Sequence, residues 1–115
     1  MVYMEDIRLT STTVLVLQVL YEQHVVYGLQ VARDTKLMTG TVYPILTRLE
    51  RAGWVASEWE AGDDADDDRG ARRRFYRLTP PAREHVSELL AKRTREQERA
   101  QERAARLRPI PGVQP

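Results

Sequence analysis

The stretch TGTVYPILTRLERAGWV (residues 39–55) places a proline inside a segment whose apolar spacing is otherwise that of a helix. Its apolar side chains recur at i, i+3, i+4 and i+7, the pattern of one buried stripe, at Val42, Ile45, Leu46 and Leu49. Proline costs little in the first turn of a helix, where backbone N–H groups lack intrahelical partners. If Thr41 is the N-cap, Pro44 loses no hydrogen bond, and if Thr39 is the N-cap it forfeits about one, worth roughly 1 kcal/mol. We therefore predict a short helix over residues 40–52 that begins shortly before the proline.

The segments around this helix predict two more short helices, two strands and a long helix. Thr10 and Ser11 are suitable N-caps for the first helix, and Gly53 is suited to end the third. Aromatic and β-branched residues favour strands after Gly53, and Pro80 and Pro81 suit the first turn of the last helix. In chain order we expect helices at 9–23, 29–36 and 40–52, strands at 54–60 and 72–78, and a helix at 80–108. This order is the winged helix-turn-helix arrangement, a mainly α fold with a small β-hairpin.

The composition limits the chain to one small domain and to a few kinds of protein. It has 115 residues, 42% of them apolar and 30% charged, with no cysteine and a formal net charge of +1. Without cysteine there is no disulfide, thiolate metal site or cysteine nucleophile. The apolar run Val14–Leu20 is too short to cross a membrane, and no signal-peptide pattern is present. We expect a cytoplasmic protein without membrane contact, metal or cofactor.

The face of the 40–52 helix opposite its apolar stripe carries small, hydroxyl-bearing and basic side chains. Threonine and tyrosine can contact phosphates or base edges, and arginine can bind guanine through two hydrogen bonds. This composition favours a helix that lies in the major groove of DNA, although the same face on an ordinary amphipathic helix would simply be solvated. The candidate DNA-binding residues on this helix are Thr39, Thr41, Tyr43, Pro44, Thr47, Arg48 and Arg51.

The predicted hairpin carries an arginine cluster close to an acidic run. Arg72, Arg73 and Arg74 stand at the start of the second strand, where a wing can reach the phosphates that flank the groove. The five aspartates within Asp63–Asp68 allow a second interpretation, in which the arginines neutralise this acidic run. A calcium loop is disfavoured because Arg69 stands where such a loop needs glycine. We expect the acidic run to form a flexible tip that points away from DNA.

Three blocks of the sequence resemble the motifs of PadR-family transcriptional regulators. They are YGLQV at 27–31, GTVYPILTRLERAGWV at 40–55 and RRRFYRLTPPAR at 72–83, in the order and spacing of the family. The resemblance implies a dimeric winged-helix repressor with its recognition helix at 40–52 and its wing at 60–72, released from DNA by a small, often aromatic, molecule. The chain departs from the family pattern in a longer and more acidic wing, at Gln30, and at His24-Val25, where Gly-Pro is usual.

The 80–108 segment is expected to be the dimerisation helix, after a winged-helix domain at 1–79 and before a disordered tail at 109–115. A single helix here is similar to the short subgroup of the family. The residues expected at the dimer contact are Val86, Leu89, Leu90, Arg93 and Ala100. Such a helix has too little apolar surface to stand alone, so we expect it to pack on the first helix and on its counterpart in a partner chain. The alternative is a solvated helix that frays beyond Arg95.

Trp54 and Trp59 are the candidate residues of a ligand pocket for an aromatic effector. The competing interpretation is that Trp54 only fills the space between the recognition helix and the wing. His24 and His85 are isolated in the sequence and are interpreted as ordinary polar residues rather than metal ligands.

These features predict a sequence-specific DNA-binding transcriptional regulator, a repressor that binds a palindromic operator in double-stranded DNA as a homodimer. The alternative is a winged-helix module that regulates through a protein partner, which the acidic loop and the near-neutral net charge favour. An enzyme is not expected, because the sequence has no cysteine, no phosphate-binding glycine loop and no credible pair of catalytic carboxylates.

Overall fold

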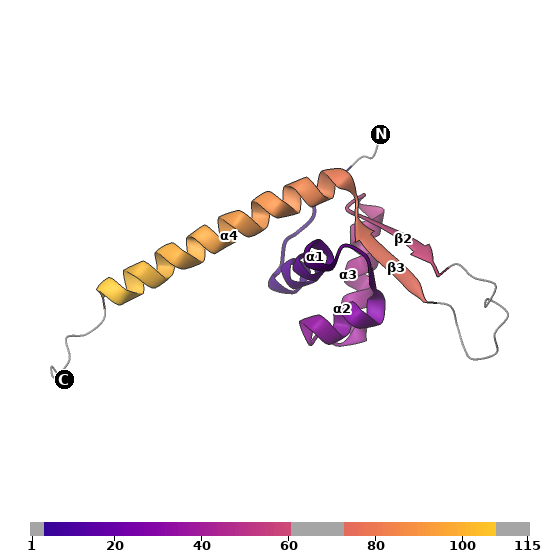
Figure 1. The fold of residues 1–115 in the computed structure, drawn as a ribbon, viewed down its shortest axis with the longest axis horizontal. Helices are drawn as coiled ribbons and strands as arrows, with labels where there is room; N and C mark the ends of the chain where they lie inside the picture. The colour runs from indigo at the N-terminus through magenta and orange to yellow at the C-terminus, as the bar shows by residue number, and fades with distance from the viewer. Residues whose placement is uncertain (1–3, 61–72, 108–115) are drawn as a thin grey trace.

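The computed structural model describes residues 4–60 and 73–107, which form four helices and a small antiparallel sheet (Figure 1). In chain order the elements are α1 (Ser11–Gln23), β1 (Val26–Tyr27), α2 (Gly28–Thr35), α3 (Thr39–Arg51), β2 (Val55–Trp59), β3 (Arg74–Leu78) and α4 (Pro80–Arg106). The predicted mainly α, winged-helix fold is therefore confirmed. The acidic run Asp63–Asp68, Arg72 and the tail predicted at 109–115 lie outside the described residues.

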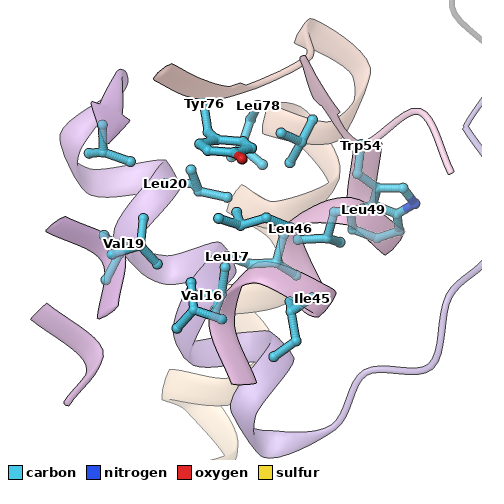
Figure 2. Close-up of a cluster of buried hydrophobic side chains, with 14 of the residues drawn as sticks. Val16, Leu17, Val19, Leu20, Ile45, Leu46, Leu49, Trp54, Tyr76 and Leu78 are labelled. Atoms are coloured by element: carbon cyan, nitrogen blue, oxygen red, sulfur yellow. The ribbon is translucent and has the colours of Figure 1, made fainter. Parts of the chain in front are cut away.

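Helix α1 is the central element of the core. Thr10 is its N-cap, as predicted, and the Thr10 hydroxyl oxygen accepts a hydrogen bond from the backbone N–H of Thr13 at 3.2 Å. Apolar side chains on more than one face of α1 are fully buried, among them Val16, Leu17 and Leu20. Figure 2 shows these side chains packed between α3, which supplies Leu46 and Leu49, and β3, which supplies Tyr76 and Leu78.

The start of α3 corrects the predicted N-cap. Met38, rather than Thr39 or Thr41, is the N-cap, and its carbonyl oxygen accepts from the N–H groups of Thr41 and Val42 at 2.9 and 3.0 Å. Pro44 therefore lies inside the helix, where it cannot donate to the carbonyl of Gly40. The four apolar side chains of the stripe are buried to 4% exposure or less, and this burial outweighs one missing hydrogen bond of about 1 kcal/mol.

The end of α3 lies where the sequence analysis predicted it. Its C-cap is Ala52, and Gly53 follows with a positive φ of 82°, the left-handed conformation that favours glycine. The N–H of Gly53 donates to the carbonyl of Glu50 at 3.1 Å, which closes the last turn. The chain then enters β2 one residue later than predicted, after the buried Trp54.

The sheet has one strand more than the predicted hairpin. Its order is β1-β3-β2, with both pairs antiparallel, so that β3 is the middle strand of the described sheet. In β1, Val26 pairs with Tyr76 and Tyr27 with Phe75. Strand β1 was not predicted, because two residues are too few to show strand periodicity. The strand exists because β3 offers it backbone partners across the fold.

Helix α4 begins with Pro80 and Pro81 at its first two positions, as predicted. Its first turns pack on α1, with Ala82 and Val86 fully buried and Leu89 and Leu90 partly buried. Every residue from 91 to 107 is exposed in the single chain. A helix of 27 residues is about 40 Å long, and α4 extends well beyond the other helices in Figure 1.

Candidate nucleic-acid interface

The outer face of α3 is open to solvent. All seven residues proposed from the sequence to bind DNA on this helix are exposed: Thr39, Thr41, Tyr43, Pro44, Thr47, Arg48 and Arg51. A shallow depression runs along the face and is lined by Tyr43 and the four exposed residues that follow it on α3, up to Arg51. No described part of the chain covers Thr47 or Arg51, so this surface is accessible to a ligand as large as duplex DNA.

The Tyr43 ring lies directly against the backbone of Gly28, the first residue of α2. A Cβ atom added at Gly28 would stand 2.6 Å from Cε1 of Tyr43 and 2.7 Å from its hydroxyl oxygen. Such approaches are far inside the contact distance of about 3.5 Å. Glycine at this position therefore allows α2 and α3 to meet with Tyr43 between them. This contact gives the glycine of the YGLQV block a structural reason.

Arg74 connects the base of the wing to α3. Its Nε donates to the Ser57 hydroxyl at 3.0 Å, and a terminal nitrogen lies 3.5 Å from a carboxylate oxygen of Glu50. The Ser57 hydroxyl donates to the same carboxylate oxygen at 2.6 Å. The Arg74 guanidinium also lies over the Trp59 ring, 4.8 Å from its centroid. Because Glu50 and Ser57 already engage it, Arg74 holds α3 to the sheet.

Arg73 is more exposed than Arg74 and lies farther along the wing. Its terminal nitrogen is 3.1 Å from a carboxylate oxygen of Glu60, and its guanidinium lies over the Tyr27 ring at 4.2 Å. The Tyr27 ring in turn stacks on Phe75. The hydrogen bond and positive charge of Arg73 hold the pKa of Glu60 below its usual value. The Arg73 side chain remains 59% exposed, so it can still reach a phosphate.

A recess of about 610 Å³ separates α3 from the sheet and from the start of α2. We call it the aromatic recess because its lining residues include Tyr27, Tyr43, Trp59 and Tyr76. Polar side chains from α3 and the wing complete it, namely Thr47, Glu50, Arg73 and Arg74. Burial raises the pKa of the Tyr76 hydroxyl above its usual value. The sequence analysis singled out none of Tyr27, Glu50 and Tyr76, although all three lie within the quoted motif blocks.

Trp54 and Trp59 do not share a pocket, contrary to their pairing in the sequence interpretation. Trp54 is 3% exposed, its indole N–H donates to the carbonyl of Glu5 at 2.6 Å, and the ring of His85 meets it edge-on. It therefore fills the space between α3, α4 and the N-terminal segment. Trp59 is 52% exposed at the end of β2 and lines the aromatic recess. The two side chains separate because Trp54 precedes β2 and Trp59 is its last residue.

None of the helices in residues 4–60 and 73–107 combines the length and the hydropathy that a membrane span requires. Residues 4–60 and 73–107 also contain no group of three or more His, Asp or Glu side chains positioned to hold a metal ion.

The three helices, the β2–β3 wing and the open, basic face of α3 define a winged helix-turn-helix protein of the DNA-binding class. The model of the family described as "Transcriptional regulator PadR-like family" matches residues 16–88. The chain therefore belongs to the PadR-like family. PadR-family regulators are DNA-binding proteins without enzymatic activity, so this protein is a DNA-binding transcriptional regulator and not an enzyme.

Several solved structures are similar in fold to this chain over most of its length. A PadR family transcription regulator from Clostridium difficile R20291 superposes with a TM-score of 0.65 at 22% identity, covering 82% of this chain and 97% of that one. The smu.1704 protein of Streptococcus mutans UA159 superposes with a TM-score of 0.67 at 24% identity, covering 86% of this chain and 92% of that one. A C30AH42A mutant of Lactococcus lactis ZitR superposes with a TM-score of 0.71 at 22% identity over 90% of this chain. This chain spans 65% of the length of the ZitR chain. A search among curated proteins found no match.

Proposed function

We propose that this protein is a homodimeric repressor that binds a roughly palindromic operator and is released from it by a small aromatic effector. One α3 helix enters the major groove at each half-site. The observation that carries this proposal is the uncovered face of α3, where hydroxyl and guanidinium groups stand next to a β wing. Membership of the PadR-like family supports the same conclusion.

Residues at the two ends of the exposed α3 face are suited to different contacts with DNA. Thr39 and Thr41 lie at its N-terminus, where hydroxyls and backbone N–H groups suit phosphate contacts. Thr47, Arg48 and Arg51 lie farther along and suit contacts with base edges. In the wing, Arg73 is proposed to contact DNA phosphates, as is Arg72, which lies outside the described residues. Arg74 supports the wing from its base.

The proposed dimer uses α4 as its contact, with residues 1–79 as the DNA-binding domain and 80–108 as the dimerisation helix. Beyond Leu90, α4 is exposed in the single chain, and Leu107 is 81% exposed. A recess of about 290 Å³ between α1 and α4 is lined by Val14, Tyr21, Leu90 and Arg93 among others. A partner's helix laid into it would cover Leu90 and Arg93, which line the recess. The proposed contact extends along α4 to Leu89 and Ala100, while Val86 supports it from beneath. Sedimentation of a monomer at micromolar concentration would contradict this assembly.

The DNA contacts are tested by selecting bound fragments from a random duplex pool and measuring affinity for the selected operator. Arg51→Ala should weaken operator binding and relax sequence preference, since a good base contact is worth about 1–3 kcal/mol. Arg99→Ala is the matched control, because Arg99 is an exposed arginine on α4 away from the proposed groove contact. Equal affinity and selectivity in the wild type and Arg51→Ala would refute the docking. Absence of salt-dependent duplex binding would instead favour the protein-interaction alternative.

A further inference from the structure

The segment that leads into α1 is fixed along one side of α3. The N–H of Glu5 donates to the carbonyl of Ala52 at 2.8 Å, and the Glu5 carbonyl accepts from the Trp54 indole at 2.6 Å. Ile7 packs on the hydrophobic core. The chain follows α3 back from its C-cap, since Ile7 and Arg8 border residues that lie one to two turns earlier in that helix.

Arg8 lies beside Arg48 of α3. The two side chains border one gap of about 10 Å³, together with the buried Ile45 and Leu49. A gap of that size has room for about one water molecule, so the segment packs closely on the helix. Both arginines are nonetheless exposed. The N-terminal segment thus adds a second guanidinium group to one edge of the open face of α3.

Neither arginine is neutralised by a partner within residues 4–60 and 73–107. The ion pairs among these residues are all made by arginines of the wing, and Arg8 and Arg48 take part in none of them. Glu5 and Asp6, the carboxylates of the N-terminal segment, do not line the gap. Two like charges held close together repel each other, and an anion that contacts both removes this repulsion. This edge of α3 is therefore suited to an anion.

The position of the pair relative to the wing indicates which anion it would meet. Tyr43, Thr47 and Glu50 border the wing side of α3, where they line the aromatic recess. At 3.6 residues per turn, Arg48 lies roughly 140–160° round the helix from Tyr43 and Glu50. Arg8 therefore stands on the side of α3 away from the wing. A helix is about 10–12 Å across and the major groove about 12 Å wide, so both sides of a docked helix come close to a phosphate backbone.

We propose that Arg8 binds a DNA phosphate on the side of the major groove away from the wing, next to the base contact assigned to Arg48. The contact presupposes the docking of α3 and so rests on the proposed function. The planar fork of N–H donors on arginine matches phosphate oxygens. From outside the helix-turn-helix, Arg8 would fix α3 in the groove on the side that the wing does not reach. A phosphate contact carries no sequence information, so Arg8 contributes to affinity for every duplex alike.

Binding of the full-length protein to the selected operator and to an unrelated duplex, over a range of salt concentrations, tests this contact. Arg8→Gln should weaken both complexes by roughly tenfold per protomer and lower the salt slope by about 1 per protomer. Arg8→Lys keeps the charge and should keep the slope. Arg99→Gln, the same change at an exposed arginine of α4, is the matched control. Unchanged affinity and slope in Arg8→Gln, or a loss confined to the operator, would overturn the proposal.

Urea unfolding separates a DNA contact from a structural role. Because Arg8 forms no ion pair with a described residue, Arg8→Gln should leave the free energy of unfolding unchanged while DNA binding falls. A loss of stability in both Arg8→Gln and Arg8→Lys, in step with the loss of binding, would assign Arg8 to folding and overturn the proposal.

Neutral methylphosphonates, placed one at a time in the operator, locate the phosphate. At one position in each half-site the replacement should weaken binding of the wild type but have no further effect on Arg8→Gln, since the charged contact is already lost. Arg48→Gln should remain sensitive at that position. Equal sensitivity of the wild type and Arg8→Gln at every position refutes the contact. If the wild type shows no salt-dependent duplex binding at all, the proposed function fails instead.

Discussion

Replacing Gly28 by alanine tests the contact that joins α2 to the recognition helix. The new methyl group would approach Cε1 and the hydroxyl oxygen of Tyr43 to 2.6 and 2.7 Å. These distances are about 1 Å shorter than a favourable contact. Overpacking of this kind costs about 1–3 kcal/mol. Gly28 has no positive φ, so alanine can adopt its backbone and stabilises by about 0.5 kcal/mol through the unfolded state. We expect a net loss of about 1.5 kcal/mol in the free energy of unfolding.

Gly28→Ala should change the free energy of unfolding in the opposite direction when the Tyr43 ring is absent. In a Tyr43→Ala background nothing of the tyrosine remains for the new methyl group to meet, so Gly28→Ala should stabilise by about 0.5 kcal/mol. The coupling between the two positions is then about 2 kcal/mol. Tyr43→Phe is the matched control, because the phenyl ring keeps Cε1 and Cζ, which lie 2.6 and 2.8 Å from the added methyl group. In that background the destabilisation should persist.

Urea unfolding followed by circular dichroism, at one fixed protein concentration, measures these free energies. Gly28→Ala should also weaken operator binding, because Tyr43 is displaced on the DNA-binding face of α3. An equal effect of Gly28→Ala in the wild-type and Tyr43→Ala backgrounds would show that the ring does not constrain position 28, and the reasoning would be wrong.

Three further perturbations test local interactions. Trp54→Phe removes the indole N–H that donates to the Glu5 carbonyl and should destabilise by about 1 kcal/mol in urea unfolding; no change would contradict that bond. Thr10→Ala removes the N-cap of α1 and should cost a similar amount, about 1 kcal/mol, whereas Thr10→Ser should not. The lowered pKa of Glu60 favours its ionised form in the folded state, so its contribution to stability is complete above the ordinary value of 4.5 and is lost as the pH falls below it. In an NMR titration, Arg73→Gln should raise the pKa of Glu60 toward that value.

The helices were predictable because their signals are local. The buried stripe of α3, the Thr10 cap of α1, the glycine after α3 and the two prolines that open α4 each act through neighbours within one or two helical turns. The main local error was the N-cap of α3. Two threonines stood near the expected start, but the carbonyl of Met38 closes the first turn, and the sequence pattern does not distinguish a backbone cap from a side-chain cap.

The outer face of α3 was also predictable, since the side opposite a buried stripe is exposed once the helix packs. The contacts of the wing arginines were less predictable from the sequence. The three arginines looked alike in the sequence, but Arg74 contacts Glu50 of α3 and Arg73 contacts Glu60 beyond β2. These partners lie 24 and 13 residues away in the chain. The pairing follows from the register of β2 on β3 and the packing of β2 against α3, which no short segment contains.

The amino-acid order alone thus determined the helical elements, the winged-helix class and the side of α3 that is left open, because periodicity and capping are properties of adjacent residues. Tertiary structure decided the third strand, the separation of Trp54 from Trp59, the distinct surroundings of Arg73 and Arg74, and the aromatic recess. The recess could not be predicted because its rings come from four elements, and only the packing of α2, α3 and the sheet brings them to one place.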